Sequence, residues 1–145
     1  PNFMPDKFES GTLNLPGIIG LNAALEYVCE RTPAAILNHE LDLACMFMDE
    51  LRDVKGVRIV GPAGRENRVG TVSLDFTCSD NADVAYRLDA EYGIMTRCGL
   101  HCAPLAHKSL GTYPQGTVRF AFGYRNTEDD VKYAAEAIKT ILDNN

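Results

Sequence analysis

Two segments of this sequence alternate apolar and polar side chains, and this alternation places the strongest limit on the fold. The apolar members are Val72, Leu74 and Phe76 in the first segment and Val118, Phe120 and Phe122 in the second. Because successive side chains of a β-strand point to opposite faces, each segment predicts a strand with one apolar and one wet face. Short apolar runs at Val57–Val60 and Ile94–Thr96 predict two further strands.

An apolar sheet face must be covered by another layer, and helical spacing precedes the strands. A stripe from Ile18 to Val28 follows Pro16, which suits a first helical turn. Thr32 and Pro33 then predict a cap and a first position for a second helix, whose stripe ends before Gly56.

Two later helices complete this layer. One is predicted to be capped by Asp80 or Asn81 and ended by Gly93. The last opens at Asn126 or Thr127, with three acidic residues in its first turn. Three or four short strands backed by helices predict an α+β fold.

Composition narrows the classes of function. A chain of 145 residues with 46% hydrophobic residues is long enough for one domain core. A net charge of −6 disfavours nucleic acid as a binding partner. No apolar run approaches the length of a membrane-spanning helix. Five cysteines, an odd number, without a secretory leader indicate free thiols in a reducing compartment, so we expect a cytoplasmic protein.

The segment Thr96–His107, TRCGLHCAPLAH, gathers groups that do chemistry. A thiol reacts as thiolate, and nearby cations favour that form. Arg97 lies five positions before Cys102 and His101 is adjacent to it, so a loop that folds back would bring positive charge to the sulfur and lower its pKa. Cys102 is the first candidate nucleophile.

Each of the other cysteines has a simpler interpretation. Buried cysteine usually behaves as a small apolar side chain, and we expect this for Cys29, Cys45, Cys78 and Cys98. A zinc site built from Cys98, His101, Cys102 and His107 is disfavoured, because structural zinc sites use two separated ligand pairs. No metal site is predicted.

Three weaker candidates remain. Arg119, in the middle of a predicted strand, is either a surface arginine or a planar fork that grips a carboxylate. The turn with Gly11 and Thr12 offers backbone N–H groups of the kind that hold a phosphate. Lys108 is a poor Schiff-base lysine, because nothing apolar surrounds it to depress its pKa.

Three motifs in order resemble the C-terminal part of class V aminotransferases, specifically the pyridoxal-phosphate enzymes of the cysteine desulfurase and selenocysteine lyase branch. The motifs are FESGTLNLPGIIGLNAAL from Phe8, RCGLHCAP from Arg97 and GTVRFAFGYRNTEDDV from Gly116. The resemblance runs nearly end to end. It implies a small α+β domain of the type I fold at residues 33–145, preceded at residues 1–32 by the tail of the large cofactor domain and a linking helix.

The resemblance also implies roles for single residues. Cys102 matches the cysteine that receives sulfur as a persulfide, and Arg119 matches the arginine that holds the substrate carboxylate. Gly11 and Thr12 match a turn that reaches the cofactor phosphate of the partner subunit in a homodimer. Arg97 and His101 match the loop around the cysteine and are carried as substrate-binding candidates.

One departure from the family limits what this chain does alone. The family's Schiff-base lysine lies in a Ser-x-His-Lys segment of the large domain, and nothing in this sequence matches it. We therefore expect a C-terminal fragment of a longer enzyme. We expect this fragment neither to bind pyridoxal phosphate nor to be active by itself. The expected substrate of the parent enzyme is cysteine or selenocysteine, and a sulfur-acceptor protein is a further expected partner.

Two other functions stay open at this stage. One is a transaminase or epimerase of the same family, for which Cys102 has no use. The other is a stand-alone binding or dimerisation module. An upstream reading frame with a Ser-x-His-Lys segment would favour the enzyme over the module.

Overall fold

The computed structural model describes residues 1–9 and 11–144 and divides the chain into two compact units, Pro1–Ile36 and Leu37–Asn145. The first unit holds a short 3-10 helix, η1 (Asp6–Phe8). It continues with helix α1 (Leu15–Arg31), where Pro16 stands in the first turn as predicted. The side chain of Asn14 caps α1 by accepting the N–H of Gly17 at 3.1 Å.

Helix α1 carries its apolar stripe on the surface. None of its residues is buried, and Ile18, Leu21 and Leu25 are each at least half exposed, at 50%, 61% and 54%. The next helix, α2 (Pro33–Leu51), begins as predicted, with Thr32 Oγ1 accepting the N–H of Ala35 at 3.2 Å. The boundary between the two compact units falls inside α2, after Ile36.

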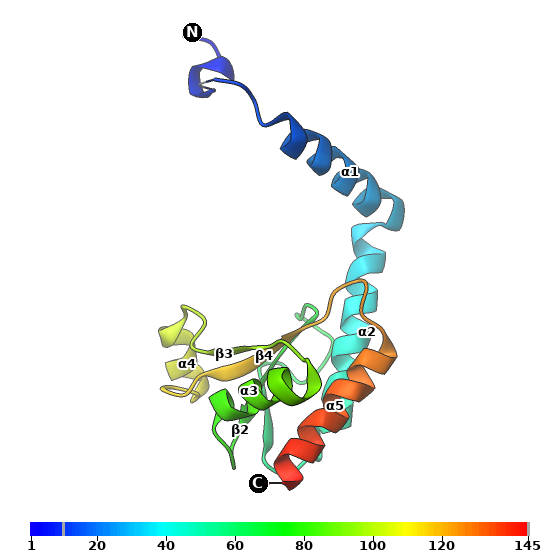
Figure 1. The fold of residues 1–145 in the computed structure, drawn as a ribbon, viewed down its shortest axis with the longest axis vertical. Coiled ribbons are helices and arrows are strands. Elements are labelled where there is room, and N and C mark those ends of the chain that lie inside the picture. Colours follow the sequence, from blue (N-terminus) through cyan, green and yellow to red (C-terminus); the bar gives the residue numbers. More distant parts are fainter. Residues whose placement is uncertain (10, 145) are drawn as a thin grey trace. The chain divides into compact units, whose positions relative to one another are not determined.

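The second unit is built on a four-stranded antiparallel sheet in the order β1-β2-β4-β3 (Figure 1). The strands are β1 (Val57–Val60), β2 (Thr71–Phe76), β3 (Arg97–Gly99) and β4 (Thr117–Ala121). Strand β1 has the bounds expected from the sequence, and the apolar positions of β2 are almost fully buried. The predicted α+β fold is confirmed, and every strand pair of its sheet is antiparallel.

Helices α2, α3 (Asn81–Tyr92) and α5 (Glu128–Asp143) supply the apolar side chains that meet this sheet. Phe47 of α2 lies against Phe120 of β4, with ring centroids 4.9 Å apart. Fully buried residues of the other two helices, such as Leu88 and Ile138, complete the same core. This packing leaves the other face of the sheet to its polar residues.

The helix ends settle the alternatives left by the sequence. Asp80 caps α3 by accepting the N–H groups of Ala82 and Asp83, and Gly93 ends it with φ of 67°. Thr127, and not Asn126, caps α5 through a reciprocal pair of bonds with Asp130. By accepting these hydrogen bonds, the cap side chains satisfy N–H groups that the first helical turn leaves unpaired.

Two expectations were wrong. The strand predicted at Ile94–Thr96 lies three residues later, as β3, because pairing with β4 selects Arg97–Gly99. The segment after Cys102, expected to be a loop, contains helix α4 (Pro104–Leu110). Seven residues are too few for a clear apolar period, although Pro104 at its start and Gly111 after its end are typical helix boundaries.

None of the described helices is long and apolar enough to cross a membrane.

Candidate functional site

Two arginines face each other on the polar side of the sheet. Arg97 of β3 and Arg119 of β4 are direct antiparallel partners, and Ser73 of β2 is the partner of Arg119 on its other side. Directly opposed residues share a face of a sheet and lie close together. The cross-strand register thus brings together two residues that are twenty-two positions apart in the sequence.

This arrangement costs stability unless an anion offsets it. Like charges directly opposite one another destabilise a strand pair by roughly 0.2–1 kcal/mol. Among the residues that the structure describes, neither Arg97 nor Arg119 has a carboxylate within ion-pair distance. Two unpaired guanidinium groups on rigid strands are suited to bind a carboxylate or another anion.

His101 follows β3, which is an edge strand of the sheet, and its ring forms a hydrogen bond with the backbone of that strand. Its Nε2 is 2.8 Å from the carbonyl oxygen of Arg97, which only accepts, so Nε2 carries the proton of this bond. Partial burial is the largest influence on His101 and lowers its pKa. The hydrogen bond to the Arg97 carbonyl raises the pKa, which opposes this effect. The positive charges of Arg119 and Arg97, and the neighbouring His107, lower the pKa further. A neutral ring protonated at Nε2 leaves Nδ1 with a lone pair that can accept a proton.

Cys102 is exposed on a turn with unusual backbone geometry. His101 and Cys102 have φ of 49° and 62°, in the left-handed region that non-glycine residues rarely adopt. The N–H of Ala103 closes the turn on the carbonyl of Leu100 at 2.8 Å, and α4 begins at the next residue. Strained backbone of this kind clusters at functional sites, where the surrounding structure holds it.

The remaining cysteines divide in a way that the sequence did not predict. Cys98 and Cys45 pack against the core as expected, but Cys29 and Cys78 are exposed. The buried interpretation is therefore wrong for these two. Cys29 lies on α1, which buries no residue, and Cys78 lies in the turn after β2. Burial raises the pKa of the Cys98 thiol, and the charge of Asp80 raises it further, so Cys98 is a poor nucleophile.

The phosphate-binding candidates belong to the first compact unit. Gly11 has φ of 96°, and a Cβ added there would meet no atom within 4 Å, so the backbone of this turn is open to an approaching group. Thr12 beside it is exposed, and Ser10, which precedes Gly11 in the sequence, lies outside the described residues. These features suit the phosphate end of a cofactor.

Three lysines of the part that the structure describes lie in settings that do not suit the cofactor's aldehyde. Lys108 lies on α4, exposed, with Nζ 5.0 Å from the ring centroid of Tyr113. Lys139 donates to Glu50 at 3.0 Å, and Lys132 lies near two acids of its own helix. Lys108, Lys132 and Lys139 are thus poor candidates for binding the aldehyde of pyridoxal phosphate.

His107 is a residue of this region whose position the sequence did not predict. Its ring is buried in α4, its Nδ1 lies 2.7 Å from Thr112 Oγ1, and its ring centroid is 5.9 Å from that of His101. Only the unforeseen helix α4 brings it there. Within residues 1–9 and 11–144, no three histidine, cysteine, aspartate or glutamate side chains are gathered as a metal site.

The family model described as Aminotransferase class-V matches residues 2–134 of this chain. The probable cysteine desulfurase of Methanothermobacter thermautotrophicus is 33% identical over 138 residues, which make up 94% of this chain and 34% of that protein. The probable cysteine desulfurase of Pseudomonas putida is 35% identical over 134 residues, or 92% of this chain and 32% of that protein. The chain thus spans about one third of the length of these relatives.

Solved structures agree with this placement. The apo structure of a cysteine desulfurase from Thermococcus onnurineus superposes with a TM-score of 0.87 and 31% identity, over 97% of this chain and 34% of that chain. The cysteine desulfurase CsdA from Escherichia coli gives a TM-score of 0.82 and 32% identity, over 96% and 33%. From the matched motifs, the family model and this shared fold, the chain belongs to the class V aminotransferase family.

Proposed function

We propose that this chain is the C-terminal part of a longer pyridoxal-phosphate enzyme that removes sulfur from cysteine, leaving alanine and a persulfide on Cys102. The observation that carries the proposal is the exposed thiol of Cys102 on a left-handed turn, next to His101, whose pKa the charges of Arg119 and Arg97 lower. A sulfur acceptor must reach this thiol, and its exposure permits that. Selenocysteine is an alternative substrate of the same chemistry.

The exposed stripe of α1 supports a longer protein. A globular chain rarely leaves a contiguous apolar helix face in water, since such patches mark contact surfaces. Leu15, Ile18, Ile19, Leu21 and Leu25 are all half exposed or more. We assign residues 1–32 to the tail of the large domain and its linking helix, and residues 33–145 to the small domain. The two thirds of each relative that lie outside the match would supply the cover.

Each residue of the site has a definite part in this proposal. The fork of Arg119 binds the substrate carboxylate, with Arg97 adding positive charge from the opposite strand. His101 accepts a proton at Nδ1, which allows a neighbouring thiol to react as thiolate. Gly11 and Thr12 would hold the phosphate of a cofactor in a partner subunit, as in a homodimer.

The sulfur transfer is a displacement at the substrate sulfur. The thiolate of Cys102 attacks this sulfur, a sulfur–sulfur bond forms, and the carbon–sulfur bond of the substrate breaks with its electron pair kept by carbon. A proton added to that carbon completes alanine. Pyridoxal phosphate, when bound, supplies the electron sink that stabilises the developing negative charge. Because the family's Ser-x-His-Lys segment has no match in this sequence, we propose that the chain is inactive alone.

The test uses the full-length enzyme incubated with cysteine. We expect alanine to form, and mass spectrometry to find one added sulfur atom on the peptide that carries Cys102. Cys102→Ser should abolish both, whereas Cys78→Ser, which changes another exposed cysteine, should not. A keto acid that retains sulfur, formed equally well by Cys102→Ser, would instead establish a transaminase.

A further inference from the structure

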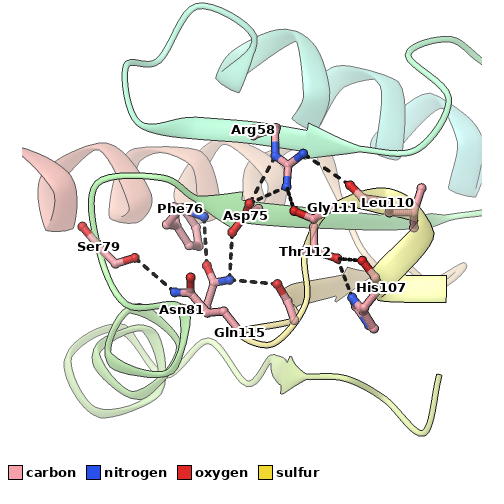
Figure 2. Close-up of polar contacts among 11 residues, drawn as sticks. Arg58, Asp75, Phe76, Ser79, Asn81, His107, Leu110, Gly111, Thr112 and Gln115 are labelled. Carbon is pink, nitrogen blue, oxygen red and sulfur yellow. Dashed lines mark hydrogen bonds and ion pairs between the residues drawn. The ribbon is translucent and has the colours of Figure 1, made fainter. Parts of the chain in front are cut away.

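A polar network joins strands β1 and β2, helix α3 and the end of helix α4, and its centre is a fully buried asparagine. The side chain of Asn81 has no exposed surface, and its Oδ1 accepts the N–H of Phe76 at 2.8 Å. Its Nδ2 donates to Asp75 Oδ1 at 3.1 Å and to the carbonyl oxygen of Gly116 at 3.0 Å (Figure 2). A buried side chain with all its polar atoms satisfied holds its partners firmly in place.

Through Gly116, the network contacts Gly99, the residue of β3 after which the turn with Cys102 begins. A Cβ added at Gly116 would lie 2.2 Å from the carbonyl carbon and oxygen of Gly99, so the two backbones are in direct contact. Gly99 is the last residue of β3, three positions before Cys102. By binding the Gly116 carbonyl, Asn81 fixes the support on which the start of the turn rests.

A second branch reaches the far side of the turn through Arg58. The guanidinium of this β1 residue binds Asp75 Oδ2 at 2.7 Å and 3.1 Å, and it also donates to the carbonyl oxygens of Gly111 at 3.1 Å and Leu110 at 3.4 Å (Figure 2). These carbonyls close the C-terminal end of α4, the helix that begins directly after the turn. Arg58 therefore holds α4 against the sheet.

Asp75 joins the two branches, since one carboxylate oxygen serves Asn81 and the other serves Arg58. Its side chain is only 13% exposed. The positive φ angles of His101 and Cys102 require a frame that resists relaxation, because isolated residues rarely stay in that region. The network thus reaches the strand before the turn at Gly99 and the helix after the turn at its C-terminal end, Leu110 and Gly111.

We propose that Arg58, Asp75 and Asn81 are positioning residues for Cys102: they hold β3 and α4 so that the thiol keeps its place relative to Arg119. This inference rests on the proposed function only for its effect on sulfur transfer. Its structural part, the immobility of the turn, stands independently. None of the three belongs to the proposed carboxylate grip, so their loss should change the placement of the nucleophile and not the binding of the carboxylate.

Three variants of the full-length enzyme test this. Arg58→Met removes the fork and keeps the aliphatic stem, and Asp75→Asn keeps the shape and removes the charge that both branches share. Arg65→Met is the matched control, because Arg65 also joins a carboxylate, Asp42, to a backbone carbonyl, that of Asn38. Asp75→Asn provides the test should Arg58→Met fail to fold.

The first measurement is hydrogen exchange, which needs no activity. We expect Arg58→Met and Asp75→Asn to speed exchange of the Ala103 amide and its neighbours by about fivefold or more, while amides of the β2 core stay within about twofold, because the opening is local. Arg65→Met should leave the turn unchanged. Unchanged exchange at the turn in both test variants, or an equal increase in Arg65→Met, would overturn the proposal.

The second measurement separates positioning from general stability. With cysteine as substrate, the two test variants should lower kcat by roughly 10- to 100-fold, the effect of a small displacement of a reacting group, and leave KM within about twofold. A rise in KM with unchanged kcat would contradict the proposal. If the unmodified enzyme releases no sulfur, the proposed function fails, while the exchange measurement still decides whether the network holds the turn.

Discussion

Replacing Arg119 with lysine tests the proposed carboxylate grip most directly. Lysine keeps the positive charge and loses the planar fork that forms two parallel hydrogen bonds. A charge-assisted hydrogen bond contributes about 1.5–3 kcal/mol. Loss of the paired geometry should therefore cost ~2 to 3 kcal/mol, or roughly a hundredfold in kcat/KM. Arg97, the direct partner of Arg119 across β3 and β4, still contributes its charge, which keeps the loss from being larger.

The assay is steady-state alanine formation by the full-length enzyme over a range of cysteine concentrations. Arg125→Lys is the matched control, because Arg125 is an exposed arginine in the loop after β4. It should keep the original kcat/KM, and the cofactor spectrum should be unchanged in both variants. If Arg119→Lys also keeps the original kcat/KM, the carboxylate is held elsewhere, and Arg97 becomes the first residue to examine.

The structure adds an opposite expectation for stability. Because Arg119 and Arg97 repel each other without a carboxylate partner among the described residues, Arg119→Gln should not lower the urea midpoint of the protein and should raise its stability by up to ~1 kcal/mol. A residue whose removal weakens substrate binding and spares the fold has a binding role. A clear loss of stability in Arg119→Gln would refute this reasoning.

Three further predictions follow from the site. Cys102 should be alkylated by iodoacetamide faster than the exposed Cys29 and Cys78, as shown by peptide mapping at neutral pH; faster labelling of either would contradict its activation. Pyridoxal phosphate added to the 145-residue chain should give no saturable visible band, and a band lost in Lys108→Ala would overturn this. Because the pKa of His101 is lowered from 6.5 in the folded state, the unfolded chain binds more protons below that pH. The stabilising contribution is thus present above about pH 6.5 and lost as pH falls, so urea midpoints should show a smaller acid decrease in His101→Gln.

Much of the fold follows from local sequence patterns. The period-2 segments, the caps at Thr32, Asp80 and Thr127 and the stop at Gly93 each act within a few residues, so the elements that depend on them were predicted with nearly correct bounds. Local sequence patterns gave wrong bounds where the pairing of two strands selects the residues of a strand. Strand β3 exists at Arg97–Gly99 because β4 offers its hydrogen bonds there, and nothing within the segment selects that register over Ile94–Thr96.

The sequence alone singled out Cys102, Arg97, His101 and Arg119 as candidate site residues, since they stand in recognisable motifs. Only the tertiary structure decided how they meet. The register of β3 on β4 places two arginines on one face, and helix α4 closes the turn of Cys102. The Arg58–Asp75–Asn81 network had no sequence pattern at all, because Arg58 joins partners 17 and 53 residues away. Contacts at such separations depend on chain folding as a whole, and no local propensity encodes them.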